Sequence, residues 1–298
     1  MNKTLSVLAV PLLLISTSIF SFFTIKNNWD FELSSYIIFL FTLIYILFLE
    51  KKIPLKKEWK SAKKSIWIDL KHLIFSAALF DALGKMITLY IVLVLQDFFS
   101  FHINLWDTIP LIITYIIANL IGEFLPYLYH RVSHKGNKKS NLSVFLWKIH
   151  AIHHIPKKLN WFKTNWMHPI NMFANVIFKM LPLFLLGFSK EIIYLVGITH
   201  IIIAYISHAN IYTQKSFWDY IIVTPHIHHF HHSKNIKEAK NFGNTFPFWD
   251  LLLGSYYNRV GSVKQVGVLE DVNNNYPDKN NYLKHIAYPF YSFKTCCK

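Results

Sequence analysis

Cysteine and acidic residues are both scarce in this chain, and each shortage narrows what the protein can be. The only cysteines are the adjacent pair Cys296 and Cys297, so no disulfide framework can stabilise the fold. The 298 residues include 16 Asp and Glu against 31 Lys and Arg, which gives a net charge of +15. No acidic residue occurs between Arg131 and Lys190. Because no nucleic-acid recognition motif accompanies the basic charge, we expect no nucleic-acid partner.

Charged residues of both signs together form a small fraction of the chain, whereas apolar residues are abundant and concentrated in runs. Hydrophobic residues make up 53% of the chain and aromatic residues 17%, with 16% charged. Residues 5–25 and 36–49 are nearly free of charge, and 86–95 and 111–120 are close to it. A bilayer span needs about 20 apolar residues, a length that 5–25 reaches alone and the others reach with their flanks. The first run lacks a small-x-small cleavage site, so it is predicted to be a span rather than a signal peptide.

These runs predict an all-α, polytopic membrane bundle. Residues 5–25 and 35–49 should form a hairpin, followed by a lysine-rich loop at 50–65, a helix at 72–95 and a helix at 108–129. Within the third segment, Asp81 and Lys85 lie four residues apart and could pair across one turn. A second hairpin is expected at 172–187 and 191–207. Counting crossings from a cytosolic N-terminus places the basic loops on the cytosolic side, as the positive-inside rule requires.

Three histidine clusters lie in the polar segments between these helices. They are His130-Arg-Val-Ser-His134, His150-Ala-Ile-His153-His154 and His228-His229-Phe-His231-His232. Positions i, i+3 and i+4 are neighbours on a helix, so each HxxHH cluster is expected to direct three imidazoles at one point. His229, between these positions, should point away. The eight remaining imidazoles are twice what one tetrahedral zinc needs, and imidazole also suits iron and copper, so two metal ions are predicted.

Polar residues near the clusters could orient the imidazoles. Metal-bound histidines usually donate their second N–H to a carboxylate, an amide or a carbonyl. Asp250 is one candidate, and Glu123 is another because it lies two helical turns before His130. Asn244 follows Gly243 in a turn-like segment and could also hydrogen-bond a ligand.

Two other functions would use clustered histidines. A membrane metal transporter would place its ligands within spanning helices near the middle of the bilayer. A zinc-dependent membrane hydrolase would need an acidic general base among the ligands, as in HExxH. The clusters instead lie in polar, basic segments and contain no glutamate, which favours a redox enzyme.

The ordered motifs resemble those of the fatty acid hydroxylase/sterol desaturase superfamily. The resemblance begins at Glu123 and Tyr127, includes the three clusters, and ends at Asn241-Phe-Gly243-Asn244 and Trp249-Asp250-Leu-Leu-Leu-Gly254-Ser255. Two single histidines, His168 and His208, also stand where that family has them. Trp166 stands where the family usually has arginine, and Ser255 where it often has threonine.

This resemblance implies an integral-membrane oxidoreductase with two non-haem iron ions and O2 as co-substrate. It implies hydroxylation or desaturation of a sterol, fatty acyl or related lipid, with electrons from a cytochrome b5, a ferredoxin or a reductase. The metal ligands it implies are His130, His134, His150, His153, His154, His168, His208, His228, His231 and His232. The expected divisions are N-terminal helices at 1–107, a catalytic domain at 108–258 and a tail at 259–298. The histidine clusters should face the cytosol, from the plasma membrane of a bacterium or the endoplasmic reticulum of a eukaryote.

Overall fold

The computed structural model describes residues 3–59, 65–99, 106, 108–136, 140–269 and 276–291. Cys296 and Cys297 lie outside the described residues. The long helices are α1 (Lys3–Lys26), α2 (Phe31–Lys52), α4 (Leu79–Phe99), α5 (Leu111–Ser133), α7 (Pro169–Leu185) and α8 (Lys190–His208). Shorter helices are α3 (Ile66–Lys71), α6 (Asn141–His154), α9 (Pro225–His231), α10 (Phe248–Leu252) and α11 (Tyr282–Ala287). The described chain pairs its backbone as helices and isolated bridges, which confirms the all-α prediction.

Five helical segments are long and apolar enough to cross a membrane. They are Thr4–Lys26, Phe31–Lys52, Ile66–Leu95, Leu111–Ser133 and Lys190–His208. Many of their apolar side chains are exposed, including Ile19, Leu40 and Met86, as expected for helices that face lipid. The third segment is longer than the apolar run at 72–95 suggested, because α3 joins α4 through one wide helical stretch, His72–Ala78. Asp81 and Lys85 form the expected pair, with 2.6 Å between Oδ2 and Nζ.

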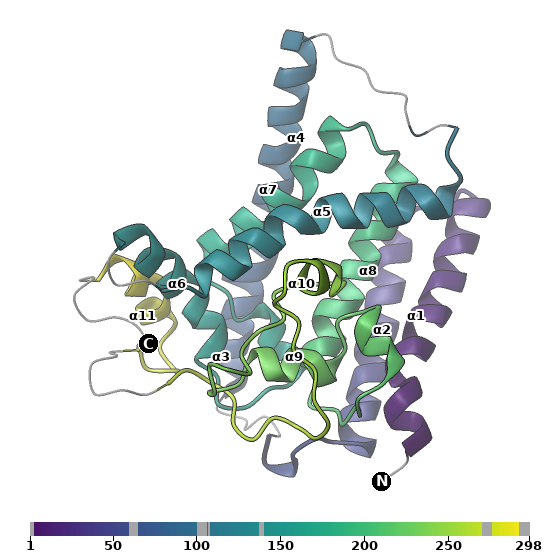
Figure 1. The fold of residues 1–298 in the computed structure, drawn as a ribbon. Helices are drawn as coiled ribbons and strands as arrows, with labels where there is room; N and C mark the ends of the chain where they lie inside the picture. The colour runs from purple at the N-terminus through teal and green to yellow at the C-terminus, as the bar shows by residue number, and fades with distance from the viewer. Residues whose placement is uncertain are drawn as a thin grey trace.

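Two helix packings position the functional region. The first joins α1, α2 and α8 through a buried apolar core that includes Leu13, Ile46 and Ile202. The second places α7 between α4 and α5, and Figure 1 shows α4 and α7 running side by side. A Cβ on Gly84 of α4 would lie 2.9 Å from Val176 Cγ1 of α7, so only glycine allows this approach.

Both packings bring helix ends to one side of the molecule. The end of α2 meets the end of α8, where the backbone N–H of Asn210 donates to the Glu50 carboxylate at 2.8 Å. Helix α9 packs against α8, and α6 packs against the end of α5 (Figure 1). The residues expected to form a C-terminal tail pack here as well: Val263 and Val266 join a core with Phe230 of α9, and Tyr288 joins one with Val144 of α6.

Candidate metal centre

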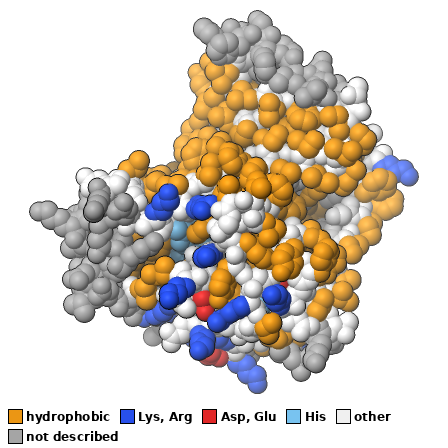
Figure 2. Space-filling model, viewed as in Figure 1, with side chains coloured by type: hydrophobic (Ala, Val, Ile, Leu, Met, Phe, Trp, Pro, Cys, Tyr) orange, Lys and Arg blue, Asp and Glu red, His pale blue; other side chains and the backbone are white. Residues whose placement is uncertain are grey.

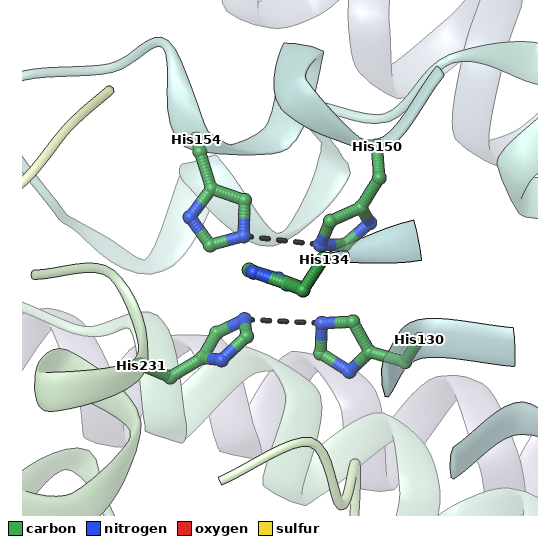
Figure 3. Close-up of side chains that lie close together, drawn as sticks. All are labelled: His130, His134, His150, His154 and His231. Carbon is green, nitrogen blue, oxygen red and sulfur yellow. Dashed lines mark hydrogen bonds between the residues drawn. The ribbon is translucent and has the colours of Figure 1, made fainter. Parts of the chain in front are cut away.

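Nine histidines gather at this junction of helix ends in two groups. Group one consists of His130, His134, His150, His154 and His231. Group two consists of His153, His208, His228 and His232. Within each group, the candidate ligand nitrogens all lie within 4.8 Å of one another. Group one is drawn from the end of α5, from α6 and from α9, and Figure 3 shows its five rings turned toward a common point.

Each HxxHH cluster is divided between the two groups, which differs from the expectation that all three imidazoles share one point. In α6, His150 and His154 belong to group one and His153 to group two. In α9, the pair His228 and His232 belongs to group two and His231 to group one. Helical geometry permits this division: positions i and i+4 differ by about 40° around the axis, whereas i+3 and i+4 differ by about 100°. The same spacing therefore serves two neighbouring sites.

Backbone carbonyls fix the orientation of four of these rings. In group one, His130 Nδ1 lies 2.7 Å from the Phe242 carbonyl, and His231 Nδ1 lies 2.9 Å from the Lys240 carbonyl. In group two, His153 Nδ1 lies 3.2 Å from the Trp166 carbonyl, and His208 Nδ1 lies 2.7 Å from the Ala204 carbonyl. A carbonyl oxygen can only accept, so each Nδ1 carries the proton and each Nε2 presents a lone pair.

The resulting lone pairs face one another at short range. The Nε2 atoms of His130 and His231 are 3.0 Å apart, the lower dashed contact in Figure 3. The Nε2 atoms of His153 and His208 are also 3.0 Å apart. Burial holds the pKa of His153 and His231 well below the usual value of 6.5, so these rings are neutral near pH 7. Two lone pairs at this distance repel unless a cation lies between them, and the donor set therefore fits a metal ion in each group.

The carbonyls of group one belong to a loop, residues 240–245, that two carboxylates hold. Asp250 accepts the backbone N–H groups of Phe242 at 2.8 Å and Gly243 at 2.7 Å. From the other side, Glu123 accepts the backbone N–H groups of Asn244 at 3.1 Å and Thr245 at 3.0 Å. Asp250, Glu123 and Asn244 thus lie next to the centre as expected, but their hydrogen bonds reach the imidazoles through the loop rather than directly.

Comparison with known proteins gives the centre its context. The family model of the fatty acid hydroxylases matches residues 115–255, the segment that carries all nine histidines. This segment is a fatty acid hydroxylase segment. It is 27% identical over 260 residues to ornithine lipid hydroxylase OlsE of Rhizobium tropici, covering 85% of this chain and 75% of that protein. No solved structure matches. The chain is therefore a membrane lipid hydroxylase, an oxidoreductase.

Two further histidines, His168 and His229, have other partners. His168 lies outside both groups: it caps α7 by accepting from Ile170 N at 3.1 Å, and its Nε2 lies 3.0 Å from the Ile286 carbonyl. Both of its ring nitrogens are therefore in use. His229 turns away as expected, with Nε2 3.0 Å from the Ala209 carbonyl.

Trp166, one of the two departures from the family motifs noted in the sequence, has a structural role. Its carbonyl orients His153, and its indole N–H donates to Asp69 Oδ1 at 2.6 Å. Lys163 pairs with the same buried carboxylate. Sequence reasoning did not find Asp69, which lies 97 residues from Trp166 and has no motif around it.

A cavity of about 410 Å³ connects group one of the hydroxylase with the surface. Its lining includes three ligand candidates, His134, His154 and His231. Around them stand four basic side chains, Arg131, Lys135, Lys234 and Lys240, together with the apolar residues Trp147, Phe242, Val268 and Leu269. Figure 2 shows this opening, with histidine visible inside it and Lys and Arg side chains around it.

Proposed function

We propose that this hydroxylase uses two iron ions and O2 to oxidise a C–H bond of a polar membrane lipid. The observation that carries the proposal is the pair of imidazole groups whose Nε2 lone pairs converge at 3.0 Å in each group. The nine imidazoles of the two groups are more than one structural zinc needs, since it takes four ligands, and imidazole suits iron. Bound iron would supply the oxidant for an unactivated C–H bond, which no side chain can provide.

The residues of the chain would hold and shield this chemistry. In our proposal the nine histidines are the metal ligands, and the carbonyls of Phe242, Lys240, Trp166 and Ala204 keep their rings in the ligating orientation. Glu123, Asp250 and Asn244 act on the ligands by fixing the loop at 240–245. His168 is left out of this set because both of its nitrogens are engaged elsewhere.

The cavity and the relative together suggest a class of substrate. The relative hydroxylates ornithine lipid. The four basic side chains that line the cavity suit a lipid with a carboxylate or phosphate near its head, and the apolar residues suit the adjoining chain. An ornithine-type lipid is our first candidate, ahead of a fatty acyl chain or a sterol.

The proposal also includes an electron donor and the side of the membrane that the metal centre faces. We infer that a separate redox protein, such as a cytochrome b5, a ferredoxin or a reductase, supplies the electrons. The centre would face the cytosol, because the basic residues around its opening follow the positive-inside pattern. Among the described residues, neither histidine group includes a carboxylate, which disfavours a zinc hydrolase with an acidic base.

One experiment tests metal and substrate together. The protein is expressed with added iron, purified in detergent and analysed for metals, then given ornithine lipid, O2 and a reduced ferredoxin. We expect about two irons per chain and a lipid product heavier by one oxygen atom, formed only when O2 is present. A single tightly bound zinc without iron, or a product formed equally without O2, would contradict the di-iron oxygenase.

A further inference from the structure

We propose that a second hollow, which adjoins the metal cavity and shares Lys234 with it, binds a phosphate group. It measures about 210 Å³ and is lined by Lys56, Trp59, Lys157, Lys234 and Lys264, with Gln265 and Val266. Among the described residues, none of the side chains that line it is acidic. Four lysine side chains gathered at one hollow repel one another, and an anion with several acceptor oxygens, such as a phosphate group, relieves that repulsion.

The lysines are held in place by packing and hydrogen bonds. Lys56 Nζ lies 5.2 Å from the centre of the Trp59 ring and donates to the Lys264 carbonyl. Trp59 forms the buried floor, with 4% of its surface exposed. Two lysine stems pass beside Gly267, whose φ of +117° favours glycine: a Cβ there would be in ordinary contact with Lys234 Cε at 3.4 Å and Lys157 Cγ at 3.7 Å. Lys56 and Trp59 therefore form an ordered part of the hollow, whereas Lys157 and Lys264 are exposed at it.

Each wall of the hollow either belongs to a segment that carries metal-ligand candidates or is hydrogen-bonded to one. Lys157 follows His154 of α6 by three residues, and Lys234 follows His232 by two. Lys56 reaches the end of α8, since its backbone N–H donates to the Asn210 side chain at 3.0 Å. The fourth wall is tied to α9, because the backbone N–H of Gly267 donates to the His232 carbonyl at 3.0 Å. An anion bound here would connect the segments that follow α2, α6 and α9 with residues 264–266.

The position suggests where the phosphate comes from. Lys56 stands four residues beyond Lys52, the last residue of a candidate membrane span. That places the hollow at the membrane surface, where phospholipid headgroups and dissolved phosphate are both available. The two sources share the same chemistry, and the binding does not depend on which lipid the hydroxylase oxidises.

Thermal unfolding of the full chain tests this site without measuring lipid oxidation. A ligand that binds only the folded state raises the melting temperature, and at ten times its Kd we expect a rise of about 2 °C for a chain of this size. The protein in detergent is melted with and without inorganic phosphate, with chloride used to match the ionic strength. A second arm compares nanodiscs of phosphatidylcholine with nanodiscs in which part of the lipid is phosphatidylglycerol.

Two double variants with equal charge separate the pocket from general surface charge. K157Q/K264Q removes two lysines of the hollow, whereas K158Q/K237Q removes two exposed lysines outside both cavities. We expect the control to keep the full rise and the pocket variant to lose it, and K264Q alone provides a milder change at an exposed position. A rise with inorganic phosphate identifies a site open to free phosphate, and a rise only with phosphatidylglycerol identifies a headgroup site. No rise in either arm, or an equal rise in both double variants, would overturn the proposal.

Discussion

The nine imidazoles of the two groups differ in what holds the nitrogen that faces away from the metal position. Four donate to backbone carbonyls, and His150 Nδ1 lies 3.3 Å from the side-chain oxygen of Asn171. Such partners fix the tautomer and the ring plane, so they decide whether a histidine can ligate. His229 also bonds a backbone carbonyl, that of Ala209, but through Nε2 rather than Nδ1. Its ring packs against Trp59. Burial and hydrogen bonding alone therefore do not distinguish ligands from neighbours.

A prediction at this scale compares His231 with His229. We expect H231A to lose iron and to reduce lipid hydroxylation by at least about 100-fold, because it removes one imidazole of group one. We expect H229A to keep most of its iron, although loss of the bond to Ala209 costs about 1–3 kcal/mol of stability. Iron per chain and product formation should be measured at a temperature where both variants are folded. Equal loss of iron in the two variants would show that the division of the third cluster is wrong.

Among the structural elements, the loop at 240–245 connects the membrane helices with the metal centre. Its N–H groups are bound by Asp250 and by Glu123 of α5, and its carbonyls bind two rings of group one. Gly243 is required at the tightest point, since a Cβ there would lie 2.4 Å from the Phe246 carbonyl oxygen. Lys179 of α7 pairs with Glu123, so a third helix supports the same loop. The helices therefore fix the position of the loop, and the loop carbonyls fix the orientation of the His130 and His231 rings.

Replacing Asp250 tests this connection. Both oxygens of the Asp250 carboxylate accept backbone N–H groups, and the amide nitrogen of D250N would instead face one of these donors. We expect iron affinity to fall about 10–100-fold while helix content is retained, as found when groups behind metal ligands are changed. Iron retention during titration with a chelator measures the effect, with E58Q at an exposed position as the control. Unchanged retention in D250N would mean that the loop does not position the ligands.

For the whole molecule, the arrangement of the spans decides from which side the centre is reached. Helices α1 and α2 form a hairpin, so the turn at Asn27 and the end of α2 lie on opposite sides of the membrane that these helices would span. The end of α2 contacts the segment after α8, and the histidine groups are on that same side. All basic residues that line the two cavities are there too, where they can attract anionic lipid headgroups.

Cysteine labelling in intact cells tests this topology. In a variant with Cys296 and Cys297 replaced by serine, single cysteines are introduced by K158C, K237C and N27C, all at exposed positions. We expect an impermeant thiol reagent to label N27C from outside and to reach K158C and K237C only after the membrane is opened. Labelling of K158C and K237C from opposite sides would make a shared metal centre impossible. Labelling of both from outside would reverse the proposed orientation.

The sequence by itself determined the class of protein and most of the candidate ligands. Apolar runs near the length of a bilayer predict spanning helices whatever the tertiary structure, and the spacing of the histidines is a local property of each helix. The order of the motifs was sufficient to indicate the family. Asp81 and Lys85, four residues apart, could likewise be paired in advance.

Only the tertiary structure decided which histidines share a group, which partners hold their rings and which lysines come together. The division of each HxxHH cluster depends on where α5 and α8 lie around α6 and α9, which helical spacing does not specify. The partner of His130 is a carbonyl 112 residues away, and Glu123 reaches the loop across 121 residues. His168 stands at a familiar motif position, yet its neighbours Ile170 and Ile286 engage both of its nitrogens. The phosphate pocket combines four segments from distant parts of the chain, and no local pattern marks it because each lysine is unremarkable until the fold brings them together.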